Sequence, residues 1–143
     1  MNQHRIIMNF SAPPSVEDLE TMAKEILALL PEEILEHCDE LAIRIEDFPD
    51  DAVQSEMDLD DLYDLVALYR NGKEISPGVQ RKIANDDDLL ILYRRPILDL
   101  WCDTQDDLTG LLREVMIQEL ANNFEFSEDE IEEMTNRHYQ GML

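Results

Sequence analysis

The chain has 143 residues and a formal net charge of −23, with 34 acidic residues against 11 basic ones. Its hydrophobic content of 44% predicts one folded domain with an ordinary core despite that charge. So few basic side chains do not form a surface that neutralises phosphates, which argues against binding to nucleic acid or to anionic membranes.

Two further features of the sequence bear on its compartment. No apolar run approaches the roughly 18–20 residues of a membrane helix, and Met1 to Phe10 lacks the apolar core of a secretory signal. The two cysteines, Cys38 and Cys102, are too few for a disulfide framework and have helix-like, partly apolar surroundings. We therefore expect reduced thiols in a cytoplasmic protein.

Hydrophobic spacing and turn residues predict an α+β chain, with helices first, then a small sheet, then helices again. Arg94, Arg95 and Pro96 are predicted to separate the last strand from the next helix. The predicted helices cover about 15–30, 32–38, 50–57, 97–102, 106–123 and 128–138, and the predicted strands cover about 41–48, 65–70 and 89–93.

Helix-start signals and chain ends set the predicted domain limits. Ser15 with Asp18, and Ser127 with Glu130, have the spacing of capping boxes that open helices. We expect a flexible arm over residues 1–14, a single domain over 15–138 and a short tail over 139–143.

The most informative segment lies near the end of the long helix. Gln118 and Asn122 are four residues apart, so they share one helical face, with Glu119 beside them. This is the spacing of the H-E-x-x-H zinc motif, with both histidines replaced. The three residues extend the line of Leu111, Leu112 and Val115, so they face the core or line a cleft. One interpretation is a polar core patch in which the Gln118 and Asn122 amides hold Glu119.

Several segments resemble the small bacterial zincin-like metallopeptidase family, over about Val16 to Met134. Ile45–Asp50 is similar to the family's acidic strand end, and Asp64–Asn71 to its central strand. Leu89–Trp101, the most specific match, is similar to its edge strand and following helix. The resemblance implies a minimal zincin-like domain with N-terminal helices, a small mixed β-sheet, a motif-bearing helix and a C-terminal helix.

The same resemblance assigns roles to positions of the motif helix. It places Gln118 and Asn122 at the first two zinc-ligand positions, Glu119 at the general base and Glu128 at the third ligand. Glu125 stands where the family has a turn-forming Gly. Zinc prefers imidazole, thiolate or carboxylate ligands, and neutral amides are poor substitutes. We therefore expect no zinc cofactor. Without zinc there is no metal-bound water on which Glu119 could act as a general base.

Histidines elsewhere do not restore a zinc site. His4 belongs to the predicted arm, and His138 lies at the very end of the last predicted helix. His37 is adjacent to Cys38, so on a helix their side chains point about 100° apart. A carboxylate set of Glu119, Glu125 and Glu128 would suit Ca²⁺ or Mg²⁺ better than zinc.

Three functional hypotheses follow from these observations. The first is a catalytically silent homologue, not an enzyme, that retains a peptide-binding cleft. The second is an active metal-dependent peptidase or other hydrolase whose rearranged ligands include Glu119 and Glu128. The third is an acidic interaction protein for a basic partner. In the first hypothesis an extended peptide adds to an exposed edge strand, which is predicted to consist of Leu89, Leu90, Ile91, Leu92 and Tyr93.

Overall fold

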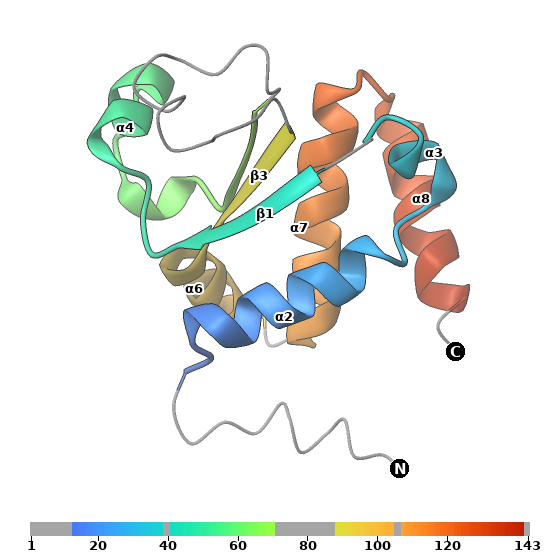
Figure 1. Ribbon diagram of the computed structural model, residues 1–143, viewed down its shortest axis with the longest axis horizontal. Coiled ribbons are helices and arrows are strands. Elements are labelled where there is room, and N and C mark those ends of the chain that lie inside the picture. The colour runs from blue at the N-terminus through green and yellow to red at the C-terminus, as the bar shows by residue number, and fades with distance from the viewer. Residues whose placement is uncertain (1–12, 39–40, 71–87, 105–106, 142–143) are drawn as a thin grey trace.

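A computed structural model describes residues 13–38, 41–70, 88–104 and 107–141, with side chains as far as Asn136 (Figure 1). Within these residues the chain forms α2 (Val16–Leu27), α3 (Glu32–Leu35), β1 (Leu41–Glu46), α4 (Asp51–Met57), a 3-10 turn η1 (Leu62–Asp64), β2 (Ala67–Arg70), β3 (Asp88–Tyr93), α6 (Arg94–Thr104), α7 (Leu108–Asn123) and α8 (Glu128–Gly141). Most of the predicted arm, the predicted turn and loop after Arg70 and the His138 side chain lie outside the described residues.

The three described strands form one mixed sheet in the order β1-β3-β2. β3 runs parallel to β1, with Leu41 opposite Asp88, and antiparallel to β2, with Ala67 opposite Leu92. A small mixed sheet among helices confirms the predicted α+β class.

This strand order overturns the predicted placement of the edge strand. Residues 89–93 belong to β3, which has a hydrogen-bonded neighbour on each side and therefore cannot accept an added peptide strand. The segment 64–71, expected to hold the central strand, instead contains β2 at the outside of the described sheet. The physical reason is visible in the residues: the unbroken apolar run 89–93 is buried on both faces, which is typical of an inner strand.

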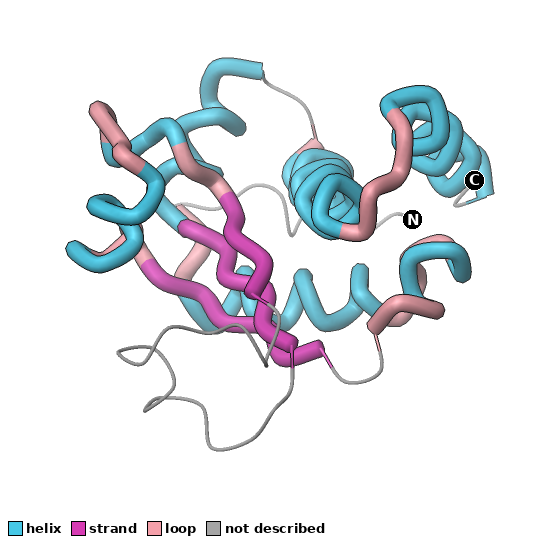
Figure 2. The backbone as a smooth tube through the Cα atoms, turned by 90° about the horizontal axis from the view of Figure 1, so that it is seen from above, coloured by secondary structure: helices cyan, strands magenta, loops and turns pink. Residues whose placement is uncertain are grey.

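The sheet separates two apolar clusters. Leu90 and Leu92 of β3 join the larger one with α2 and α7, whereas Leu89, Ile91 and Tyr93 join a smaller one with Val53 of α4. Seen from above, α7 lies between the sheet and α8 (Figure 2). The motif helix is therefore the middle layer of the domain, packed on both sides.

The predicted helix starts are confirmed at two capping boxes. The Ser15 hydroxyl accepts from the Asp18 amide at α2, and Ser127 and Glu130 exchange bonds of 2.8 and 3.1 Å before α8. The predicted end of the strand before Arg94 is confirmed, because β3 ends at Tyr93, but the predicted helix start at Ile97 is wrong, because α6 begins at Arg94. Pro96 then falls in the first turn, where its missing N–H would have no intrahelical partner.

A buried arginine holds α8 against α7. The Arg113 side chain is 2% exposed, and its guanidinium donates to the carbonyl oxygens of Met134 and Thr135 at 3.1 Å each. Burial lowers the pKa of Arg113 to about 10. These two bonds fix the spacing between α7 and α8. None of the described helices combines the length and apolarity of a membrane span.

Candidate functional site

One exposed stripe runs along the mostly buried helix α7. The exposed residues are spaced four apart and are Glu114, Gln118 and Asn122. The neighbouring residues Leu111, Leu112 and Val115 are buried. Gln118 and Asn122 therefore do not belong to a polar core patch. Of the two predicted placements, the structure supports the one that puts them at a cleft.

Two hollows share this stripe in their linings, and we call them together the α7 groove and each of them one half of it. The half toward α8 has a volume of about 490 Å³, and the half toward β2 and α6 has a volume of about 430 Å³. Both halves include the stripe itself. The α8 half adds Glu128, Ile131, Glu132, Thr135 and Asn136, and the β2 half adds Val66, Ala67, Leu100, Thr104, Leu111, Val115 and Glu119.

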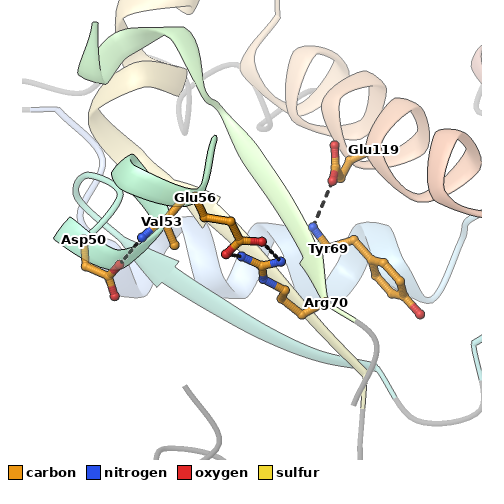
Figure 3. Close-up of polar contacts among 6 residues, drawn as sticks. All are labelled: Asp50, Val53, Glu56, Tyr69, Arg70 and Glu119. Carbon is orange, nitrogen blue, oxygen red and sulfur yellow. Dashed lines mark hydrogen bonds and ion pairs between the residues drawn. The ribbon is translucent and has the colours of Figure 1, made fainter. Parts of the chain in front are cut away.

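Glu119 is bound to the edge of the sheet. Its Oε2 atom accepts a hydrogen bond from the Tyr69 backbone N–H at 2.9 Å (Figure 3). The same atom accepts a second bond from Asn123 Nδ2 at 3.0 Å. The Tyr69 N–H can reach it because it points away from β3, on the outer side of β2. The donors are thus Tyr69 and Asn123, in place of the predicted Gln118 and Asn122 amides. Glu119 is half-buried and links α7 to β2.

β2 is also anchored to α4. Arg70 and Glu56 form a bidentate ion pair, with Nη1 donating to Oε2 at 2.7 Å and Nη2 bonded to Oε1 (Figure 3). The Arg70 guanidinium lowers the pKa of Glu56. Asp50 caps α4 by accepting from the Val53 amide at 2.9 Å. The outer strand is therefore held from α4 at its end and from α7 at its middle.

An aromatic group fixes the end of α7, and sequence reasoning did not find it. The Phe124 ring stacks on His37 with centroids 4.9 Å apart and meets Tyr69 edge-on at 5.3 Å. His37 also contacts Phe126 edge-on. The signal available in the sequence was an aromatic residue, Phe124, directly after the motif, but its partners come from the turn after α3 and from β2, far away in sequence. His37 is thus a packing residue beside the motif.

The turn after α7 places a glutamate in a glycine-like conformation. Glu125 has φ of 66°, in the left-handed region. The Phe126 amide donates to the Ala121 carbonyl at 3.0 Å and the Glu125 amide to the Asn122 carbonyl at 3.2 Å, which is the Schellman pattern of helix ends. Glu125 therefore occupies the backbone position at which the resembled family has Gly.

The structure gathers the three positions that the resemblance assigned to zinc ligands. Gln118, Asn122 and Glu128 all line the α8 half of the α7 groove. Two neutral amides and one carboxylate do not fit zinc. Within the described part of the chain, no three His, Cys, Asp or Glu side chains lie close enough to hold a metal ion. The structure therefore does not form the alternative carboxylate set of Glu119, Glu125 and Glu128.

Comparison with known proteins adds one match. A family model described as zincin-like metallopeptidase matches residues 38–138. The matched range runs from just before β1 into α8, so it includes every residue that lines the α7 groove. No curated protein matches the chain.

Proposed function

Because the chain belongs to the zincin-like metallopeptidase family, we propose that it uses the family's cleft for binding and has lost zinc-dependent hydrolysis. The observation that carries this proposal is that two changes to the motif occur together at the α7 groove. Carboxamides occupy the two histidine positions of the motif, and the Glu119 carboxylate is engaged by the Tyr69 and Asn123 donors.

The chemistry of the groove supports a loss of hydrolysis. A general base in such a site needs a water whose pKa a metal has lowered. Gln118 and Asn122 supply neutral oxygens where imidazoles would bind zinc. Glu119 accepts from a backbone amide that belongs to the sheet edge, so its carboxylate links two elements of the fold. Glu119 thus has a structural use that needs no metal.

The outer side of β2 supports a retained binding role. Among the described residues β2 has no strand partner on that side, and Ala67 lines the β2 half of the groove. The Tyr93 amide donates to the Val66 carbonyl at 2.9 Å, so Ala67 and Tyr69 fall in the non-hydrogen-bonded pairs with β3 and their backbone groups point outward. An extended peptide would pair here by strand addition. Glu119 already uses the Tyr69 N–H, so the pairing would be short.

Metal loading of matched variants tests the loss of zinc chemistry. Wild type and the variant Gln118→His/Asn122→His are equilibrated with zinc, freed of excess metal and measured for bound zinc and for peptide hydrolysis. We expect stoichiometric zinc only in the double variant, because it regains two imidazoles beside Glu128 in the same hollow. Wild type is expected to retain little zinc and to cleave no peptide.

Two results would count against the proposal. Stoichiometric zinc in wild type, with hydrolysis abolished by Glu119→Gln, would show an active peptidase. If Glu128→Ala then removed the zinc, rearranged ligands would be the explanation. Failure of the double variant to bind zinc would show that the groove no longer has the family's ligand geometry, which would contradict a retained cleft.

A further inference from the structure

The α8 half of the α7 groove has polar walls from two facing helices. α7 supplies the stripe Glu114, Gln118 and Asn122, and α8 supplies residues that recur at helical spacing. The contribution of α8 consists of Glu128, Ile131, Glu132, Thr135 and Asn136. This half is therefore a hollow rich in hydrogen-bond acceptors, with one apolar residue in its lining.

Its charge is uniformly negative. Glu114, Glu128 and Glu132 are exposed carboxylates, and within the described residues none of them forms an ion pair. No lysine or arginine lines either half of the groove as described. Arg113 is next to Glu114 in sequence, but its buried guanidinium donates to the backbone of α8. Among the side chains that the structure describes, the hollow thus offers acceptors to a cation and contains no basic group.

We propose that the α8 half of the groove binds the guanidinium group of an arginine in a partner peptide. Guanidinium is planar and carries five N–H donors, which suits carboxylate and carboxamide oxygens on two facing walls. An ammonium group would satisfy fewer of these acceptors. The carbonyl oxygens of Gln118 and Asn122 add neutral acceptors between the carboxylates. The substitutions that remove zinc ligands thereby leave a site for an organic cation.

The two halves of the groove explain why the cation belongs to a peptide. Both halves share the stripe of Glu114, Gln118 and Asn122, so they meet along the exposed face of α7. A main chain lying beside Val66 and Ala67 would send one long side chain across this stripe into the α8 half. This assignment rests on the proposed binding of an extended peptide at β2, whose partner it specifies as arginine-containing.

A pair of matched peptides tests the guanidinium site. The probes are fluorescein-labelled, end-capped peptides of alternating valine and threonine with one central arginine or, in its place, citrulline, which has the same shape without charge. Affinities are measured by fluorescence polarisation at fixed salt. We expect the arginine peptide to bind at least about tenfold more tightly, because charge-assisted hydrogen bonds exceed neutral ones.

Charge-matched variants separate the groove from the overall field of the protein. Glu128→Gln/Glu132→Gln is expected to abolish the preference for arginine. Glu25→Gln/Glu36→Gln changes the net charge equally at exposed positions outside both halves of the groove, so it should keep the preference. An equal loss in both variants would show nonspecific attraction and would overturn the proposal.

Two other outcomes separate this inference from the proposed peptide binding. Equal affinity for the two peptides in wild type would overturn the guanidinium site and leave binding at β2 intact. If neither peptide binds, peptide binding fails, and a titration with agmatine followed by backbone amide NMR decides the site. Shifts at Thr135 and Asn136 in wild type, absent from Glu128→Gln/Glu132→Gln, would support it, and the absence of any shift would overturn it.

Discussion

Replacing Glu119 with alanine tests whether this residue is a structural link between α7 and β2. The substitution removes the acceptor of two hydrogen bonds, from Tyr69 N–H and Asn123 Nδ2. Hydrogen bonds to a charged group contribute about 1.5–3 kcal/mol each, and a half-buried site favours the lower end. The loss also leaves the Tyr69 amide without its acceptor. We expect Glu119→Ala to lower the free energy of unfolding by about 2–3 kcal/mol.

Denaturant unfolding and amide exchange check this prediction. Glu119→Gln retains a carbonyl oxygen that can accept from Tyr69, so its expected loss is only about 1 kcal/mol. Hydrogen exchange at the Tyr69 amide should accelerate strongly in Glu119→Ala and weakly in Glu119→Gln. A domain of this size would lose roughly 6–10 °C in Tm with alanine. Wild-type stability and unchanged Tyr69 exchange in Glu119→Ala would refute the structural role.

Two further predictions concern single residues whose replacement should stabilise the fold. Glu125→Gly should raise the free energy of unfolding by about 1 kcal/mol, because Glu125 has φ of 66° and glycine adopts this conformation more easily. The control Glu125→Ala keeps a Cβ and should change the free energy little. Equal stability of the two variants in denaturant unfolding would contradict this prediction. Tyr93→Phe should raise the free energy of unfolding by about 1 kcal/mol, because the Tyr93 hydroxyl is buried without a hydrogen-bond partner among the described residues. A lower melting temperature in the Phe variant would show that the hydroxyl is satisfied in solution.

Local sequence signals predicted most of the helices and strands correctly. Capping residues act on amides within three or four positions, so Ser15 and Ser127 could be read without any tertiary information. The start of α6 at Arg94, before the predicted Ile97, also has a local reason, since proline is compatible with the first turn of a helix as well as with the residue before it. The resemblance to the zincin-like family, now confirmed by the family match, located the motif helix.

The candidate site was only partly predictable. The sequence identified Gln118, Glu119, Asn122 and Glu128, and the fold brings all four to the α7 groove. It did not identify the donors to Glu119. Tyr69 is 50 residues away from Glu119 along the chain, and its N–H reaches the carboxylate only because β2 is the outer strand. Asn123 was within reach of sequence reasoning, being four residues on in the same helix.

The amino-acid sequence by itself determined the helices with their caps, the charge and the exchange of two zinc-ligand positions for amides. These depend on side-chain chemistry and on contacts within a few residues. Only the tertiary structure decided which strand lies outside, where Glu119 is bound and how α7 and α8 enclose an acidic hollow. Strand order and helix packing depend on contacts between distant segments, and several orders bury the same apolar residues. For that reason the apolar sequence of the run 89–93 indicates that it is buried, but only the fold shows which strands pair with it.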